Sequence, residues 1–210
     1  MSAGGAFDSG PAGIEAEAIA GVFVESRWRV AGATIVVGMA GVMMAAGCRA
    51  PLSEQPVGVA EPIVRLEGYV NVFRDGEILF AGQPTVDALR EAGRSGVKVV
   101  VNLRSDAEMA SHVDFDEPEV VGDAGMKYVQ LPVTPATLSA ADADALSAVL
   151  SATPGPVLVH CASSNRVGGL WALYLHRHRG VPFDRAMELG ECAGMRSPAL
   201  ALAVQRAAGQ

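Results

Sequence analysis

The sequence is poor in cysteine and carries fewer basic than acidic residues. Its three cysteines, Cys48, Cys161 and Cys192, are too few and too scattered for a disulfide framework, and no pair has metal-ligand spacing. Sixteen Lys and Arg against 23 Asp and Glu give a formal net charge of −7. Because non-specific nucleic-acid binding requires a basic face, this balance argues against it. We therefore expect neither a metal ion nor a nucleic acid as partner.

Near its start the sequence has a long apolar run behind a short basic patch. Arg27 and Arg29 precede an uncharged run over residues 30–47, which ends in Ala-Ala-Gly before Cys48. A positive start, an apolar middle and small residues before a break are features of a secretory signal. The pattern resembles a bacterial lipoprotein signal, which implies a lipid on Cys48 and a domain tethered at the cell envelope, outside the cytoplasm. A membrane-spanning anchor and a buried core helix are the alternatives.

The chain divides into three parts by composition. Residues 1–48 form the N-terminal extension with its signal or anchor. Residues 49–67 contain three prolines and no stable hydrophobic period, so we expect a linker. From Gly68 onward strand and helix patterns alternate, and residues 68–210 are expected to form one domain.

The pattern over this domain predicts strands separated by helices. Asp75-Gly76 suits a tight turn between two short strands. The apolar runs within 97–103, 126–133 and 155–160 are typical of further strands, and the first and last read as buried on both faces. This order predicts an α/β domain with a mainly parallel central sheet and helices on both faces. Helices are expected over 84–96, 116–125, 138–152, 166–180, 182–194 and 197–209.

The stretch VLVHCASSNRVGGLW, residues 157–171, carries the candidate chemistry. Cys161 lies where a buried strand ends, and Arg166 where the next helix begins. Loop N–H groups and a helix N-terminus bind anions, arginine offers a fork of donors, and the positive field favours a thiolate. His160 is expected to orient the loop, and a small buried cysteine without chemical role is the alternative. The expected anion-binding residues are Ala162, Ser163, Ser164, Asn165 and Arg166.

The loop and its surroundings resemble a family of cysteine-dependent phosphatases. HCASSNR is similar to the signature H-C-x-x-G-x-x-R, and the order GQP, NLR, HC…NR is similar to a bacterial phosphatase-like domain often fused to beta-lactamase-like hydrolases. That domain is dual-specificity phosphatase-like, and the resemblance covers about 68–195. It implies a cysteine-phosphatase fold, attack of Cys161 on phosphorus and phosphoryl oxygens held by Arg166. It also implies a small phosphorylated or other anionic substrate and no metal or organic cofactor.

Three features of the loop depart from the phosphatase signature. Four residues separate Cys161 from Arg166, where that signature has five. The shorter spacing is similar to the rhodanese loop, which carries a persulfide, and it also occurs in the bacterial phosphatase-like domain. Ser164 stands in place of a glycine, and Val167 in place of a hydroxyl residue that helps the cysteine leave. A rhodanese-like sulfurtransferase and a non-catalytic anion-binding module are therefore the alternatives.

A phosphatase also needs a general acid for the leaving oxygen. In the dual-specificity relatives an aspartate follows the strand that matches KYVQL, and Thr134 stands near that place here. Asp106, in the loop after the neighbouring strand, is expected at the same sheet edge as Cys161 and is the candidate acid, with Glu108 close by. Arg104 is expected either to line the site or to pair with Asp106. A solvated loop carboxylate is the alternative for Asp106.

Overall fold

The computed structural model describes residues 57–63 and 66–210. The N-terminal extension over 1–48, with its basic patch and Cys48, lies outside the described residues. The lipidated cysteine, the apolar anchor and the cell-envelope location therefore stay predictions. Among the residues that are described, no helix is both long enough and apolar enough to cross a membrane.

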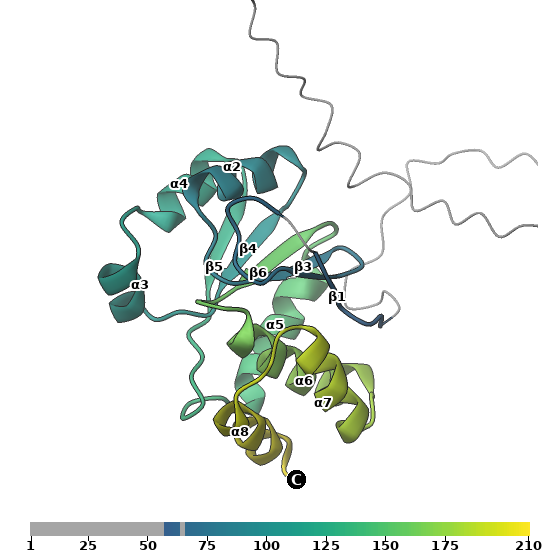
Figure 1. Ribbon diagram of the computed structural model, residues 1–210. Helices are drawn as coiled ribbons and strands as arrows, with labels where there is room; N and C mark the ends of the chain where they lie inside the picture. The colour runs from purple at the N-terminus through teal and green to yellow at the C-terminus, as the bar shows by residue number, and fades with distance from the viewer. Residues whose placement is uncertain (1–56, 64–65) are drawn as a thin grey trace, which may run out of the picture. The chain divides into compact units, whose positions relative to one another are not determined.

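In the described part of the chain, six strands form one sheet in the order β1-β2-β3-β6-β4-β5 (Figure 1). The strands from β3 to β5 in this order run parallel, whereas β1 and β2 pair antiparallel at one edge. The predicted mainly parallel sheet is thereby confirmed. The strands are β1 Glu61–Pro62, β2 Phe73–Asp75, β3 Ile78–Ala81, β4 Val99–Asn102, β5 Lys127–Gln130 and β6 Val157–His160.

The antiparallel edge contains one predicted feature and one that differs from expectation. β2 and β3 form the hairpin expected near Asp75, with Asp75 paired to Ile78 and Gly76 in the turn at φ 56°. Residues 57–63 were expected to belong to the linker, yet β1 pairs with β2 and Ala60 is buried. The reason is that the outer side of β2 offers unpaired backbone groups, which a neighbouring segment can satisfy. Proline is tolerated in such an edge strand.

Helices cover both faces of the sheet, as predicted (Figure 1). The core on one face joins the sheet to α2 and α4, and the core on the other joins it to α5, α6, α7 and α8. Side chains alternate between the two faces along a strand. In β6, Leu158 therefore packs in the first core and Val159 in the second. The helices are α2 Val86–Arg94, α3 Asp106–His112, α4 Glu117–Asp123, α5 Ala140–Ala152, α6 Asn165–Arg179, α7 Phe183–Cys192 and α8 Pro198–Ala208.

The sequence did not predict α3, which follows β4 directly. α3 buries none of its seven residues, so it has no apolar period to reveal it. Its start is a capping box: the Ser105 hydroxyl accepts from the N–H of Glu108, and the Glu108 carboxylate accepts from the N–H of Ser105. The box fixes the position of Glu108 relative to the end of β4.

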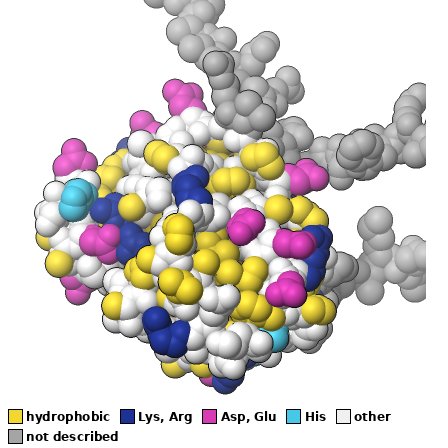
Figure 2. All heavy atoms as spheres, turned by 60° about the horizontal axis from the view of Figure 1, so that its bottom comes forward, with side chains coloured by type: hydrophobic (Ala, Val, Ile, Leu, Met, Phe, Trp, Pro, Cys, Tyr) yellow, Lys and Arg dark blue, Asp and Glu magenta, His cyan; other side chains and the backbone are white. Residues whose placement is uncertain are grey.

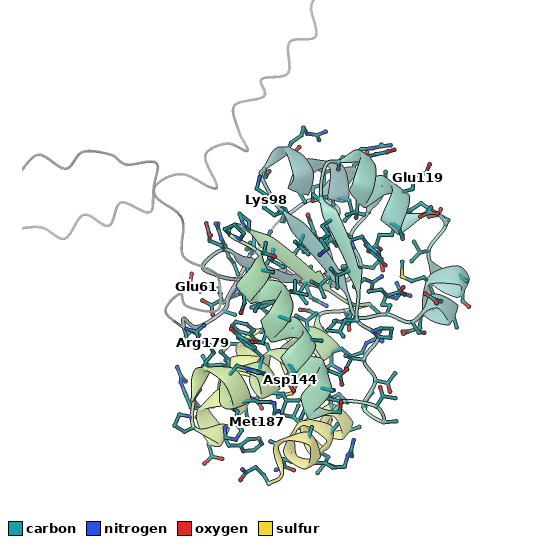
Figure 3. The ribbon with its side chains drawn as sticks, turned by 180° about the vertical axis from the view of Figure 1, so that it is seen from behind. Glu61, Lys98, Glu119, Asp144, Arg179 and Met187 are labelled. Atoms are coloured by element: carbon teal, nitrogen blue, oxygen red, sulfur yellow. The ribbon has the colours of Figure 1, made fainter. Side chains whose placement is uncertain are left out.

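α6 begins at the candidate loop and is buried along most of its length. Gly168 and Gly190 let α6 and α7 approach closely, because a Cβ on either would overlap the backbone of the other helix. At the far end of α6, Arg177 and His178 bind Asp144 of α5 at 2.6 and 2.8 Å, and Figure 3 labels Asp144 on the back of the molecule. The loop and the surface ion pair thus lie at opposite ends of one helix.

On the face that Figure 2 brings forward, hydrophobic side chains gather near the centre and charged ones lie around them.

Candidate active site

Residues 161–164 connect β6 to α6 at the carboxyl ends of the parallel strands. The Cys161 N–H donates to the carbonyl of Ala81 at 3.2 Å, and the Gln83 N–H donates to the carbonyl of Ala162 at 3.3 Å. A bridge between Gly82 and the loop continues this pairing. The loop therefore runs along the segment that leaves β3, and that segment holds its first half in place.

The second half of the loop is held by side chains. The carbonyl of Ser163 accepts from Asn71 Nδ2 at 3.3 Å and from Arg196 Nη2 at 2.5 Å. Asn165 Oδ1 accepts from the N–H of Arg196 at 2.7 Å, which ties that segment to the loop. Because a trans peptide is planar, with C=O and N–H on opposite sides, these contacts turn the N–H of Ser164 away from the donors. The same argument turns the N–H of Ser163 away from Gln83. Amides arranged in this way can bind an anion.

Ser164 adopts the backbone conformation that the sequence comparison assigned to glycine. Its φ is 65°, in the left-handed region. Its side chain is buried, and its hydroxyl donates to the carbonyl of Ala193 at 3.0 Å. A bond of this kind contributes about 1 kcal/mol, comparable with the cost of about 1–2 kcal/mol for a left-handed residue that has a Cβ. The loop therefore keeps its shape without a glycine.

Arg166 is braced beside the cysteine. Cys161 is 1% exposed and packs with the core on the α5 side. The Arg166 guanidinium donates to both carboxylate oxygens of Glu108 at 2.8 Å, and to the carbonyls of Leu103 at 3.3 Å and Val133 at 3.1 Å. Burial lowers the pKa of Arg166, but the bonds to Glu108 and the nearby Cys161 outweigh it and raise that pKa above its usual value. A permanent positive charge thus lies beside the thiol.

Glu108 is an ionised brace for Arg166. The bond from Arg166 lowers the pKa of Glu108 to about 2, against the opposing effect of partial burial and with help from the N–H of Ser105. A carboxyl group with so low a pKa holds no proton to donate near neutral pH. The sequence analysis placed Glu108 near the site but did not find its pairing with Arg166.

Replacing Glu108 by glutamine is expected to remove a pH-dependent contribution to stability. Because the folded-state pKa lies below the ordinary value of 4.5, the contribution is present above that pH and is lost as the pH falls toward 2. Urea unfolding should show Glu108→Gln less stable than the wild type at neutral pH, with the gap closing by about pH 2. Glu119→Gln, at an exposed carboxylate on α4, is the matched control. A gap of equal size at both pH values would contradict this assignment.

Asp106 lies on a different side of α3 from Glu108, because residues two apart do not share a helix face. Its Oδ1 accepts from Gln130 Nε2 at 2.7 Å. Gln130 lies in register, across β4, with His160, so both side chains belong to the α2 and α4 face of the sheet. The structure therefore brings Glu108, and not Asp106, to Arg166.

Behind the loop, on the α2 and α4 face, lies a buried polar chain. Arg104 does not pair with Asp106. Its Nη1 donates to Gln83 Oε1 at 2.7 Å, and its Nη2 donates to the carbonyl of Glu108 at 3.2 Å. Gln83 Nε2 donates to Glu117 Oε2 at 2.7 Å, and His160 Nε2 lies 2.6 Å from Glu117 Oε1. Sequence reasoning named Arg104 and His160 but missed Glu117, and it treated Gln83 only as part of GQP.

The loop after β5 contributes hydroxyl groups and a carbonyl. Thr134 and Thr137 bind each other through their hydroxyls at 3.0 Å. The next carboxylate along the chain, Asp142, accepts from the N–H of Ser139 at 2.8 Å and so caps α5. Thr134 therefore closes a local turn, and Asp142 belongs to the helix.

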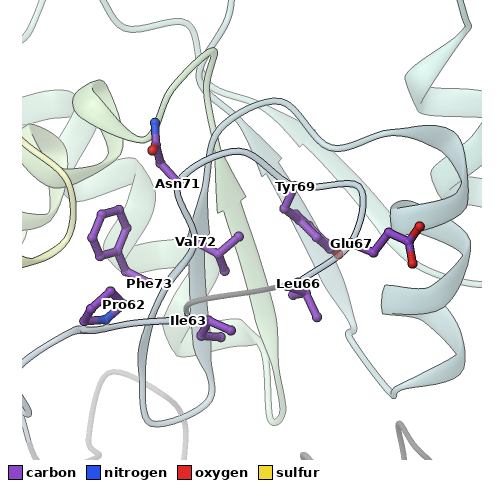
Figure 4. Close-up of a pocket in the computed structure, with 8 residues that line it drawn as sticks. All are labelled: Pro62, Ile63, Leu66, Glu67, Tyr69, Asn71, Val72 and Phe73. Carbon is purple, nitrogen blue, oxygen red and sulfur yellow. The ribbon is translucent and has the colours of Figure 1, made fainter.

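A groove of about 720 Å³ adjoins the loop (Figure 4). Asn71 links the two, since it lines the groove and donates to the carbonyl of Ser163. The groove mixes apolar and polar walls, which suits a ligand with an apolar body and a charged end. Its lining residues are Pro62, Ile63, Leu66, Glu67, Tyr69, Asn71, Val72 and Phe73.

Comparison with known protein sequences points to one domain type. Residues 74–176 match the family model described as "Beta-lactamase hydrolase-like protein, phosphatase-like domain". Beta-lactamase hydrolase-like proteins of Xylella fastidiosa and Agrobacterium fabrum are 34% and 31% identical over 97 residues. The matched region is 46% of this chain and 22% of each relative, so the chain spans about a fifth of these curated relatives.

Solved structures show the same fold. A DUF442 protein of Shewanella putrefaciens CN-32 superposes with a TM-score of 0.53 and 24% identity, covering 69% of this chain and 95% of that one. P. aeruginosa TpbA superposes with a TM-score of 0.56 and 23% identity, covering 70% and 89%. TpbA has also been solved in complex with pTyr. At these identities the likeness shows a phosphatase-like fold and nothing beyond the fold.

Proposed function

We propose that this chain is a cysteine-dependent phosphatase acting on a phosphate monoester, because residues 74–176 match the model of the phosphatase-like domain of beta-lactamase hydrolase-like proteins. One observation carries the proposal. Cys161 is buried at the start of a loop that turns the N–H groups of Ser163 and Ser164 away from the donors to their peptide carbonyls. Beside it, Glu108 holds Arg166 in place. This arrangement combines a nucleophile with fixed donors for an oxyanion.

The reaction proceeds in two displacements. The Cys161 thiolate attacks phosphorus while Arg166 and the amides of 162–165 bind the non-bridging oxygens. The bond to the leaving oxygen breaks, and that oxygen takes a proton from water. A second water then attacks the cysteinyl phosphate, which releases inorganic phosphate and restores the thiolate. Val167 is buried and offers no hydroxyl to the departing sulfur, so the second step is expected to be slow.

The N-terminal extension, residues 1–48, would determine where in the cell the domain is located. A lipid on Cys48, or an apolar anchor over residues 30–47, would hold the domain at the cell envelope and outside the cytoplasm. This part of the proposal rests on the sequence pattern.

Sulfur transfer is the second candidate, because four residues between Cys161 and Arg166 suit a loop that binds a small anion or a persulfide. Two assays of the full chain under reducing conditions distinguish phosphatase from sulfurtransferase activity. One supplies a small aryl phosphate, and the other supplies thiosulfate with a thiol acceptor. We expect phosphate release and no sulfite. Sulfite release without phosphate release would select the sulfurtransferase, and tungstate binding without either would select an anion-binding module.

A further inference from the structure

The buried chain behind the loop joins Arg104, Gln83, Glu117 and His160. Arg104 is 4% exposed, Glu117 1% and His160 0%. Charges so buried are found where they are paired and hydrogen-bonded. Here one cation and one anion are joined through an amide, since Gln83 accepts from Arg104 and donates to Glu117. Such a chain has a defined direction of donors and acceptors.

The direction is set at Glu117, whose two oxygens each face a donor. Gln83 Nε2 can only donate, so it requires an acceptor at Oε2. At Oε1 the partner is His160 Nε2, which donates in the imidazole tautomer that leaves no buried N–H unpaired. His160 Nδ1 is buried and has no hydrogen-bond partner, so a switch of the imidazole to the other tautomer would bury an unpaired N–H. Glu117 thus fixes the orientation of both neighbours.

Gln83 and His160, the two neighbours of Glu117, both contact or adjoin the loop that follows β6. The Gln83 backbone N–H donates to the carbonyl of Ala162 and thereby turns the N–H of Ser163, in the same peptide, away from Gln83. His160 directly precedes Cys161 in the chain. We propose that Glu117 and Gln83 are positioning residues, which fix the loop amides and Cys161 in the geometry that binds the phosphoryl group. This deepens the proposed function and rests on it.

Exchange of the two side chains tests the proposal. Glu117→Gln puts an amide where two donors converge, and Gln83→Glu puts two carboxylates against each other. In the double variant the new carboxylate at 83 accepts from Arg104 and from the new amide at 117, whose oxygen accepts from His160. Every hydrogen bond that links residues 104, 83, 117 and 160 is thereby restored, with the amide and the carboxylate exchanged. The double variant should therefore regain the tungstate affinity and the Cys161 reactivity that each single variant loses.

The readouts on the full chain are the tungstate dissociation constant, the pH profile of Cys161 carboxymethylation, and kcat and KM for aryl phosphate. Each single variant is expected to bind tungstate about tenfold more weakly, and the double variant within about threefold of the wild type. The Cys161 profile should shift in the single variants and return in the double variant. Glu119→Gln, exposed on the same helix, should change none of these.

Two results would overturn the proposal. One is single variants that bind tungstate and react at Cys161 as the wild type does. The other is a folded double variant that binds tungstate no better than the single ones, which would mean that the loss does not come from the hydrogen bonds that the exchange restores. Where a single variant fails to fold, the double variant alone decides. Tungstate binding within about threefold of the wild type supports the proposal, and weaker binding overturns it. Because tungstate binding and carboxymethylation need no turnover, a wild type that releases no phosphate would refute the proposed function and leave this test intact.

Discussion

Replacing Cys161 by serine is expected to abolish phosphate release, with a fall in kcat of about 10⁴-fold or more. A serine hydroxyl stays protonated at neutral pH, and the described surroundings place Arg166 rather than a base beside it. The anion site itself should survive, because the amides and Arg166 are unchanged. Phosphate release and tungstate affinity, measured on the same preparation, separate the two effects.

The matched control is Cys192→Ser, a second free thiol on α7 that takes no part in the loop. It should release phosphate at the wild-type rate. If Cys161→Ser kept a tenth of the wild-type activity, or Cys192→Ser lost it, Cys161 would not be the nucleophile.

Replacing Arg166 by lysine should cost about 10²–10³-fold in kcat/KM, the effect of losing one fixed donor to a developing charge. Lysine keeps a positive charge but cannot span both oxygens of Glu108 while reaching the carbonyl of Val133. The ammonium would be drawn to Glu108 and leave the loop. We expect tungstate affinity to fall together with the rate, since the same donors serve ground and transition states.

Arg177→Lys is the matched control for that substitution. Arg177 lies on the same helix and forms the same forked pair, with Asp144, but at the surface and at the other end of α6. Exposed pairs of this kind contribute little to stability because water screens them, so neither activity nor fold should change. A rate for Arg166→Lys within threefold of that for Arg177→Lys would contradict the role of the fork.

Much of the fold follows from local patterns along the chain. Buried β-branched runs predicted the parallel strands, and the Asp75-Gly76 pair predicted the hairpin of β2 and β3. β1 was missed because its two residues gain their structure from the unpaired edge of β2, which is a property of the sheet. α3 was missed because none of its seven residues is buried and they carry no apolar period, although the capping box at Ser105 and Glu108 was readable.

The site could be predicted only where its residues are close in sequence. Cys161, Arg166 and the strained position of Ser164 belong to one loop. The partner of Arg166 lies 58 residues away and the partner of His160 lies 43 away, so spacing gave no sign of either. The expectation for Asp106 rested on its place at a strand end, whereas helix α3 turns Glu108 toward Arg166 and Asp106 toward Gln130.

The central claim is that Cys161 carries the phosphoryl group, and trapping that group tests it most directly. The full chain is mixed with an aryl phosphate under reducing conditions and quenched in acid during turnover. The masses of its proteolytic peptides are then determined by mass spectrometry. Because Val167 offers no hydroxyl to the departing sulfur, the intermediate should accumulate, and the account predicts a phosphoryl group on the peptide that contains Cys161. Turnover with an unmodified Cys161, or with the phosphoryl group on another residue, would contradict it.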